Sequence, residues 1–389
     1  MRQPLTGIRV LELGGYISAP FGTSMLAALG ADVVKVERPG VGDDFRRGKN
    51  ELETYFRQYN AGKRSLAVDI KRSEGVDLVR SLIPRFDVIV ENMRPGKVEA
   101  LGLGYEVCRS ARADIIYTSV TGFGPAGPMA QRPAYDTMGQ AFGGIYSILS
   151  PRGNAQLSGT CMADLLTGLM TVTGVLAALV GRGATGEGVQ VETSLIEAIS
   201  ALTTDAITQY YDDGRVDPDL NSRRPQGQNF VLSTESGEAI AVHLSSSQKF
   251  WHSFTLVLDQ PELAQDPRFA TYALRTENYF ELVPIVEAAF AERPAEEWEK
   301  LLDKHDVPFA PVMTMSGYLE HPQVRLLEIT EPEEDGLALV RPPWRFDGSR
   351  PHRSGTTPRV GEHTREVAGE VMDQQHIRDL IAEGVLFAS

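Results

Sequence analysis

A single carboxylate, Asp164, lies in the run SGTCMADLLTGLM (residues 158–170) among small and apolar neighbours. No histidine precedes His243, so the earlier part of the chain has no imidazole for general acid–base chemistry. Two roles are open to such a carboxylate. It can cap the N-terminus of the helix that the following apolar residues predict, or it can act as a nucleophile that takes up an acyl group.

The motifs of the common cofactor sites are missing from the sequence. The glycine turn LGGYIS (residues 13–18) lacks the G-x-G-x-x-G spacing that receives a dinucleotide, and there is no G-x-x-x-x-G-K-[ST] loop. Cys108, Cys161 and the seven histidines have no zinc-ligand spacing. Cys161 is a poor candidate nucleophile, because a lone cysteine among apolar residues is usually buried and inert. We expect neither a metal nor a tightly bound cofactor.

Positive charge is concentrated in one stretch of an acidic chain. Ten basic and six acidic residues lie between Lys35 and Arg72, whereas the whole chain has a formal net charge of -14. Arg38 and Lys71 come just past the C-terminal ends of predicted strands, where open α/β sheets bind ligands. An arginine there suits a phosphate, since its planar fork donates two parallel hydrogen bonds. The overall negative charge argues against nucleic acid or an anionic membrane surface as a partner.

Alternating β-branched and amphipathic stretches define the elements that must position these residues. They predict strands over residues 8–13, 31–37, 65–70, 87–91 and 115–120, with helices between them. Ser18 is expected to cap the first helix and Gly30 to end it. Strands that alternate with helices form βαβ units, so the fold class is α/β with an open parallel sheet.

The second half of the chain changes in composition, which predicts a domain boundary. Apolar residues from Asp164 to Val180 indicate a helix buried on most sides. The glycine-rich turn GRGATGEG and the segment VQVETSL follow, and then a long helical stretch through residue 210. Residues 211–224 are polar and indicate a linker, and residues 225–312 indicate a smaller α+β domain. The tail from residue 313 onward is punctuated by proline and ends in a predicted helix. The sequence shows no signal peptide and no run of about 20 apolar residues, so we expect a cytoplasmic protein.

Several stretches together resemble the family III CoA-transferases, the group of formyl-CoA transferase and carnitine CoA-transferase. They run in family order from residue 5 to about 367, and they are LTGIRVLELGGYISAPFGTSMLAALGADVVKVERPGVGD, YNAGKRSLAVDIK, DVIVENMRPGKVEALGLGYE, TGFGPAGP with RPAYDTMGQAFGG, MADLLTGL with TGEGVQVETSL, and GEHTREV. The resemblance implies a Rossmann-like large domain, built from residues 1–210 and from a return segment and C-terminal part, 313–389. It implies a small domain inserted between them and an interlocked homodimer. It also implies that Asp164 is the catalytic nucleophile.

Such a role for Asp164 has a chemical rationale beside the resemblance. A carboxylate can form first a mixed anhydride with an acyl group and then an aspartyl-CoA thioester. It attacks a thioester poorly, because thiolate is the better nucleophile and returns readily. The site must therefore be dry, close-fitting and lined with hydrogen-bond donors, and the small residues around Asp164 permit a close approach.

The resemblance also implies which residues bind coenzyme A. The positions that match in type are Arg38, Lys71 and Asn92, and Met93 stands where an aromatic residue that packs against adenine is common. Arg94, Ser18 and Tyr135 complete the predicted coenzyme A contacts.

Two positions near these contacts leave alternatives open. Asp136 stands where the family places an acidic residue beside the active carboxylate, with a turn or cap as its alternative role. Ala100 replaces a basic residue, so that its phosphate contact is lost or falls to Arg94 or Lys97.

The substrates and two rival functions follow from the same resemblance. An acyl-CoA, a free carboxylic acid and a second copy of the chain are the expected partners. A dicarboxylic acid with succinyl-CoA as donor is one reading, in which a second carboxylate is received by Arg46, Arg47, Arg223 or Arg224. The segment RRPQGQN (223–229) stands in place of the glycine-rich lid of formyl-CoA transferase, which argues against oxalate or a formyl group.

The first rival is a 2-methylacyl-CoA racemase, in which a histidine precedes the aspartate of the AYDTMGQ segment. This chain has Tyr135 there, and a phenol with an ordinary pKa of about 10 is a poor base at neutral pH. The second rival is a CoA-binding protein without catalysis.

Overall fold

The computed structural model describes residues 3–47, 53–333, 335–353 and 355–389. The chain divides into two compact units. Unit 1 comprises Met1–Ile145, Gly159–Thr204 and Glu328–Ser389, and unit 2 comprises Tyr146–Ser158 and Asp205–Leu327. These bounds differ from those of the predicted linker (211–224) and small domain (225–312), and the domain layout as such stays a prediction.

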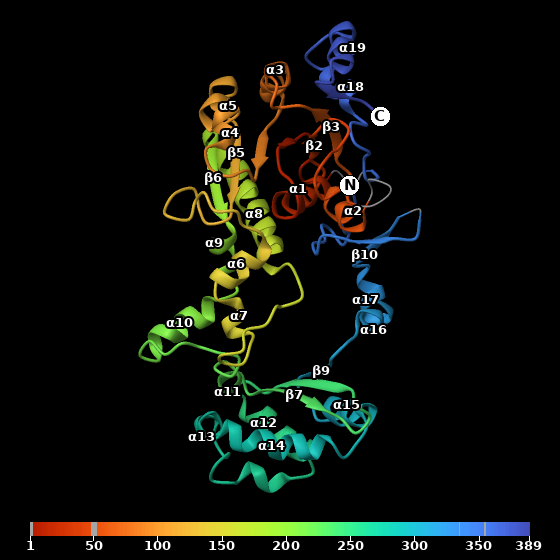
Figure 1. Cartoon of the computed structure of the whole chain (residues 1–389). Helices are drawn as coiled ribbons and strands as arrows, with labels where there is room; N and C mark the ends of the chain where they lie inside the picture. The colour runs from red at the N-terminus through yellow and green to blue at the C-terminus, as the bar shows by residue number, and fades with distance from the viewer. Residues whose placement is uncertain (1–2, 48–52, 334, 354) are drawn as a thin grey trace. The chain divides into compact units, whose positions relative to one another are not determined.

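A seven-stranded sheet forms the centre of unit 1, with the strand order β12-β3-β2-β1-β4-β5-β6. All neighbouring strands are parallel except β12, which pairs antiparallel with β3. The predicted α/β class with a Rossmann-like sheet is confirmed. The strands are β1 (Arg9–Glu12), β2 (Asp32–Glu37), β3 (Arg64–Val68), β4 (Val88–Glu91), β5 (Ile116–Thr121), β6 (Val189–Ser194) and β12 (Leu386–Phe387) (Figure 1).

This strand order places a topological switch point between β1 and β4. Chain connections leave β1 toward one edge of the sheet through β2 and β3, and β4 continues toward the other edge through β5 and β6. Loops at the carboxyl ends of β1 and β4 therefore diverge and leave a crevice, which is where open α/β sheets bind ligands.

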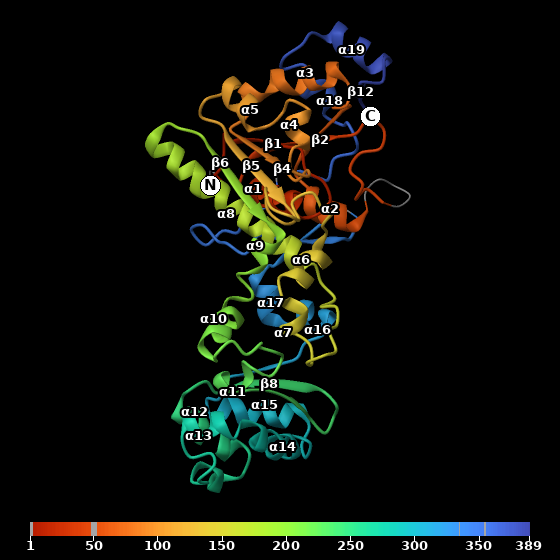
Figure 2. The ribbon, with the colours of Figure 1, turned by 60° about the vertical axis from the view of Figure 1, so that its left-hand side comes forward.

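Helices cover both faces of the sheet because successive strand residues point to opposite sides. Val10, Val33 and Val88 belong to a core that includes residues of α1 and α8, whereas Leu11, Val34 and Ile89 belong to a core with α3, α5, α18 and α19. The helices are α1 (Ser18–Ala28), α2 (Thr54–Asn60), α3 (Ser73–Leu82), α4 (Lys97–Ala100), α5 (Tyr105–Ala111), α6 (Asp136–Phe142), α8 (Met162–Thr185), α9 (Leu195–Ile199), α18 (Thr364–Ala368) and α19 (Gln374–Ala382) (Figure 2).

Helix α8 is the long apolar helix that carries Asp164, and it packs along α1. Its length and composition would also allow it to cross a membrane, a test that the buried core helix of a globular unit passes as well. The expectation that no such run exists in the chain was therefore wrong. Gly22 and Gly168 lie at the crossing of α1 and α8, where a methyl group on Gly168 would come within 2.9 Å of the Ser18 carbonyl oxygen.

Two local predictions fail for identifiable reasons. Ser18 is the first residue of α1 rather than its cap, and Ile17 occupies the cap position without a side-chain hydrogen bond. The Ser18 hydroxyl instead accepts a long hydrogen bond from the Asn92 amide at 3.5 Å. The helical stretch predicted up to residue 210 is interrupted, since α9 ends at Ile199 and α10 spans Thr204–Asp212.

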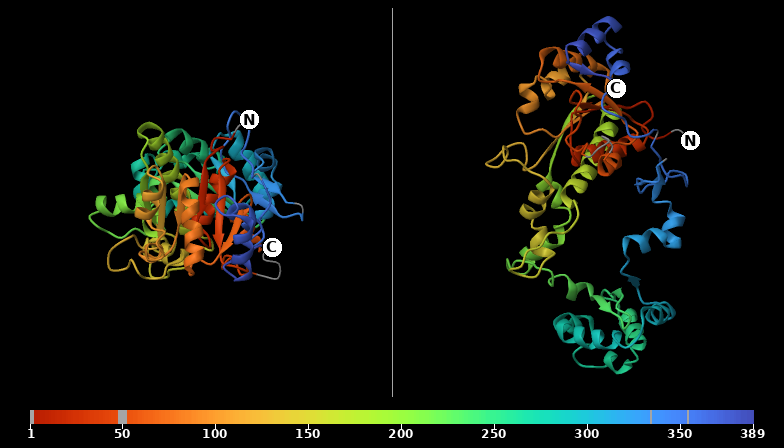
Figure 3. Two further views of the ribbon diagram at one scale, coloured as in Figure 1. Left: turned by 90° about the horizontal axis from the view of Figure 1, so that it is seen from above. Right: turned by 45° about the vertical axis from the view of Figure 1, so that its right-hand side comes forward.

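Unit 2 is an α+β unit with its own aromatic core. Its three-stranded antiparallel sheet has the order β7-β8-β9, and stacked rings of Phe290 and Trp298 lie 4.3 Å apart in its core. The elements are α10, α11 (Arg224–Gly227), β7 (Asn229–Ser233), β8 (Ala239–His243), α12 (Gln248–Val257), α13 (Tyr272–Glu277), α14 (Tyr279–Phe290), α15 (Ala295–Lys304), β9 (Phe309–Pro311), α16 (Met315–Glu320) and α17 (Pro322–Leu327) (Figure 3).

Candidate active site

A cavity of about 450 Å³ lies at the switch point of the unit 1 sheet. It is lined from the loop after β1, the loop after β4, the end of β5, the segment before α6 and the start of α8. Its lining includes Gly15, Tyr16, Ser18, Asp44, Asn92, Met93, Arg94, Lys97, Thr121, Arg132, Tyr135 and Asp164. The cavity thus brings six of the predicted site residues together: Ser18, Asn92, Met93, Arg94, Tyr135 and Asp164.

Asp164 enters this cavity as the third residue of α8, and it is only 8% exposed. Cys161, not Asp164, occupies the N-cap position. Among the residues that the structure describes, none donates a hydrogen bond to the Asp164 carboxylate. Burial, and after it the negative charge of Asp136, raises the pKa of Asp164 to about 7. No described cation or hydrogen-bond donor therefore compensates the charge of this carboxylate.

Asp136 is the residue that fixes the start of α8. Its Oδ1 accepts hydrogen bonds from the backbone N–H groups of Ala163 at 2.9 Å and Asp164 at 3.2 Å. Its Oδ2 accepts one from the Gln140 amide at 2.5 Å. Asp136 does not line the cavity. It therefore stands beside the candidate nucleophile as a cap that positions the backbone of Asp164.

Asn92 holds the glycine loop that follows β1. Its Oδ1 accepts from the Gly15 N–H at 3.0 Å, and its Nδ2 donates to the Gly15 carbonyl at 2.8 Å. Next to it, the Met93 N–H donates to Glu91 at 2.7 Å, and burial raises the pKa of Glu91 to about 7. The amide of Asn92 thus joins the two loops of the crevice, in addition to facing the cavity.

The two basic residues singled out by strand position lie outside the lining of this cavity. Arg38 forms an ion pair with Asp44 and donates to the Gly42 carbonyl at 3.2 Å, and its side chain is 52% exposed. Lys71 is exposed beyond the end of β3. The cations that do line the cavity are Arg94, Lys97 and Arg132. Lys97 was one of the two replacements expected for the basic residue missing at Ala100.

A buried cluster of charged side chains holds the loop after β1 in place. The Lys35 ammonium donates to Glu12 at 2.7 Å and to the Gly14 carbonyl at 2.7 Å, and it pairs with Asp43 at 2.8 Å. Lys63 also donates to Glu12, at 2.7 Å, and burial lowers the pKa of Lys63 to about 8. These groups act on the backbone of the loop and contribute no side chain to the cavity lining.

Sequence reasoning missed Tyr16, Asp44 and Arg132 as lining residues. Tyr16 follows the LGG turn directly after β1, so its place at the carboxyl edge of the sheet was a usable signal. Arg132 precedes the AYD segment by two positions and lies in a loop without periodicity. Lys49 and Glu51, which contribute to the local charge count, lie outside the described residues.

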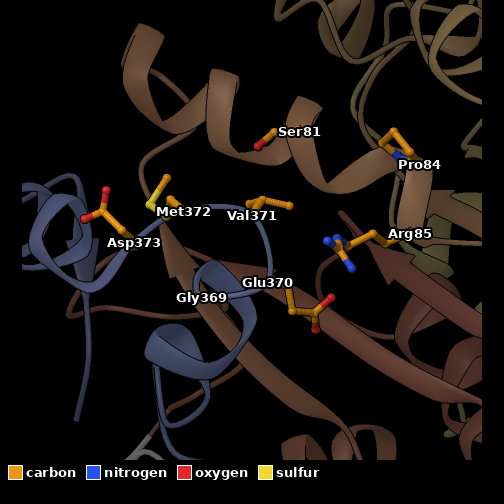
Figure 4. A pocket seen from close by; sticks show the side chains of 8 residues that line it. All are labelled: Ser81, Pro84, Arg85, Gly369, Glu370, Val371, Met372 and Asp373. Atoms are coloured by element: carbon orange, nitrogen blue, oxygen red, sulfur yellow. The ribbon is translucent and has the colours of Figure 1, made fainter.

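A second and larger cavity, of about 730 Å³, lies along residues 81–85 and 369–373 (Figure 4). Its carboxylates and its hydroxyl are already engaged within the fold. Glu370 accepts two hydrogen bonds from Arg9, Asp373 caps α19, and the Ser81 hydroxyl donates to the Leu78 carbonyl. This cavity therefore offers no free nucleophile, and the 450 Å³ cavity is the candidate active site.

The comparisons with known proteins agree on one family for this chain. The model of CoA-transferase family III matches residues 5–364. The chain is 32% identical to succinyl-CoA:glutarate CoA-transferase of Mus musculus, over 99% of this chain and 90% of that protein. It is 31% identical to succinate–glutarate CoA-transferase of Agrobacterium fabrum, over 95% and 96% of the two chains.

A solved structure gives the same result. The CaiB/BaiF family protein of Brucella suis superposes with a TM-score of 0.82 at 30% identity, covering 96% of this chain and 100% of that one. The chain therefore belongs to CoA-transferase family III, and it is an enzyme of that family.

Proposed function

We propose that this enzyme moves coenzyme A from an acyl-CoA to a free carboxylic acid through covalent intermediates on Asp164. The observation that carries the proposal is the Asp164 carboxylate itself, which is buried, has no hydrogen-bond donor among the described residues and faces the cavity at the switch point. An ordinary structural carboxylate in such a place would be paired, because an uncompensated buried charge is costly.

The reaction requires four balanced steps. The Asp164 carboxylate attacks the thioester carbonyl, the C–S bond breaks, and a mixed anhydride and the CoA thiolate form. The thiolate attacks the Asp164 carbonyl, which releases the donor acid and leaves an aspartyl-CoA thioester. The acceptor carboxylate then attacks that thioester to give a second anhydride and the thiolate. Finally the thiolate attacks the acceptor's carbonyl, which yields the new acyl-CoA and free Asp164.

The lining of the cavity supports coenzyme A as the carried group. Arg94, Lys97 and Arg132 supply three cations for charge-assisted bonds to phosphate oxygens. Met93 offers an apolar surface for the adenine, and Ser18, Asn92 and Tyr135 offer polar groups. Arg38 pairs with Asp44, which lines the cavity. Lys71 is retained as a nucleotide contact on the resemblance alone.

Succinyl-CoA as donor and a dicarboxylic acid as acceptor belong to the proposal, because relatives named for succinyl-CoA and glutarate match over nearly the whole chain. The earlier candidate Arg46 is engaged, since its guanidinium bonds Glu37 at 2.7 Å. Arg223 pairs with Asp205 and Arg224 bonds Asn221, both within unit 2. The proposal retains a cytoplasmic location, to which acyl-CoA substrates and the free cysteines Cys108 and Cys161 are suited.

The test is a panel of carboxylic acids incubated with succinyl-CoA and with acetyl-CoA, followed by mass spectrometry of the CoA thioesters. New thioesters that form with the native chain and not with Asp164→Asn support the proposal. Binding of acyl-CoA without any exchange would favour a CoA-binding protein. Deuterium uptake from D2O at the α-carbon of a 2-methylacyl-CoA, without exchange, would indicate the racemase.

A further inference from the structure

Tyr16 has an unusual backbone conformation for a residue in the cavity lining. It has a φ of 65°, in the left-handed region that a Cβ disfavours. Residues held in this way persist only where the surrounding structure determines them, and they cluster at functional sites. The side chain of Tyr16 lines the cavity that contains Asp164.

Three side chains hold the loop around Tyr16 in place. Asp43 accepts a hydrogen bond from the Tyr16 N–H at 3.2 Å, and Asn92 bonds both the N–H and the carbonyl of Gly15. Lys35 anchors Asp43 and the Gly14 carbonyl at the same time. The fold therefore fixes the backbone on both sides of Tyr16, which places its side chain rather than leaving it to a mobile loop.

The phenol of Tyr16 meets that of Tyr135 in the cavity. The two rings pack edge to face with centroids 5.3 Å apart, and the hydroxyl oxygens are 3.5 Å apart. The hydrogen bond to Tyr135, followed by burial, raises the pKa of Tyr16 to about 12, so the phenol stays a neutral donor at physiological pH. An O–H···O contact of this length is weak, and either hydroxyl can exchange it for an acceptor on a ligand.

The carboxylates nearest to Tyr16 are each paired with a cation. Asp43 pairs with Lys35 and Asp44 with Arg38, so that the negative charge they present to the phenol is partly compensated. The cations that line the cavity, Arg94, Lys97 and Arg132, are assigned to the phosphates of coenzyme A in the proposed function. In that assignment the hydroxyls of Tyr16 and Tyr135 remain as donors for the acyl end of the substrate.

We propose that Tyr16 is a specificity-determining residue, whose hydroxyl, together with that of Tyr135, binds the second carboxylate of a dicarboxylic substrate. This inference rests on the proposed function and deepens it. Two phenol O–H groups suit the two oxygens of a carboxylate, whereas a methyl group in the same place would leave the hydroxyls with only their weak contact to each other. A site that hydrogen-bonds a polar group of its substrate disfavours an analogue that lacks this group.

The test compares glutarate with pentanoate, in which a methyl group replaces the second carboxyl. The donor is acetyl-CoA, because its acyl group has no second carboxylate. Tyr16→Phe is expected to lower the ratio of kcat/KM for glutarate to that for pentanoate by about tenfold, and to leave the KM of the donor unchanged. Tyr135→Phe is expected to act on the same ratio. The matched control is Tyr105→Phe, because Tyr105 packs against Tyr117 and does not line the cavity.

Three outcomes would overturn the inference. These are an unchanged ratio in Tyr16→Phe, an equal loss for both acids, or a raised KM for every acyl-CoA, which would place Tyr16 against coenzyme A. Thermal unfolding of each variant excludes a folding defect as the cause. If the native enzyme transfers CoA to neither acid nor to any other in the panel, the proposed function fails; if it uses pentanoate as well as glutarate, only this inference fails.

Discussion

Asp164 and Asp136 are two carboxyl groups with different environments and different tasks. Asp164 is buried without a donor, and its pKa is raised to about 7. Asp136 has three donors around it and holds the first turn of α8. Asp136 thus positions the backbone of Asp164, and Asp164 is the carboxylate that we propose as the nucleophile.

The first prediction concerns Asp164→Asn. We expect transfer to fall by several orders of magnitude, because the amide cannot form the anhydride, while acyl-CoA binding persists. The raised pKa of Asp164 means that the folded state keeps a proton which the unfolded state loses between pH 3.8 and about 7. The native state therefore loses stability as the pH rises between these two values, and the loss is complete above about pH 7. The Asn variant, which does not titrate, should be more stable by on the order of 2 kcal/mol at pH 8.

Urea unfolding of both proteins at pH 8 and pH 5 checks the predicted gain in stability. The difference in the free energy of unfolding between the Asn variant and the native chain must be smaller at pH 5. Equal turnover in the Asn variant would return Asp164 to a structural role.

The second prediction concerns the pH dependence of the acylation step. Asp164 must lose its proton to attack, so the rate should rise with pH through a pKa near 7. Asp136→Asn removes the charge that adds to the effect of burial, while its side-chain oxygen can still accept from Ala163 and Asp164. In a plot of the single-turnover acylation rate against pH, the acid side of the curve should move to lower pH by on the order of one unit or less. A shift to higher pH would contradict the assigned cause.

At the scale of elements, the crossing of α1 and α8 sets the position of Asp164. Gly168 brings α8 against Phe21, Ser18 and Gly22. Both helices border the cavity, through Ser18 on α1 and Asp164 on α8. The separation of the two helices therefore determines the width of the site.

The third prediction uses two glycines of α8. A methyl group at Gly168 would lie 2.8 Å from the Phe21 ring and 2.9 Å from the Ser18 carbonyl, whereas nothing lies within 4 Å of one at Gly181. We expect Gly168→Ala to cost about 1–3 kcal/mol of stability and to lower kcat. The control, Gly181→Ala, should gain up to about 1 kcal/mol through helix propensity and leave kcat unchanged. Equal effects of the two changes on kcat would show that the crossing does not set the site.

Helices and strands could be predicted from local sequence patterns, whereas the contacts between them could not. The strands β1, β2 and β4 could be predicted from their runs of apolar residues, because the strands of a parallel sheet are buried on both faces. Ser18 was predicted as a cap from its residue type, but its hydroxyl meets Asn92, 74 residues away. Arg38 follows its strand as expected, yet Asp44 engages it. The contact between Ser18 and Asn92 depends on the pairing of β1 with β4, which no single segment encodes.

At the scale of the whole molecule, the chain returns to unit 1 after unit 2. Thr364 accepts from the Ala67 N–H at 2.9 Å, and Arg9 bonds Glu370 at 2.7 Å and 2.8 Å. The resemblance implied that both ends of the chain build the large domain, but composition contains no signal for these contacts. The interlocked homodimer likewise stays a proposal that rests on the family.

The fourth prediction is therefore the oligomeric state. Helix α10 has no buried residue, and the apolar side chains of Ile207 and Tyr211 on it are 47% and 68% exposed. Apolar side chains left open in this way suit an interface with a second copy. Sedimentation equilibrium should give twice the chain mass of 42.6 kDa at all accessible concentrations. A monomer mass that does not change with concentration would contradict the proposal.

The covalent role of Asp164 is tested most directly by trapping the enzyme during turnover. The enzyme is incubated with succinyl-CoA, treated with hydroxylamine or borohydride, digested, and analysed by peptide mass spectrometry. The account predicts a hydroxamate or a reduced side chain at Asp164, formed only when acyl-CoA is present, and none in Asp164→Asn. An adduct at Cys161, or rapid CoA exchange with Asp164 unmodified under trapping, would contradict it.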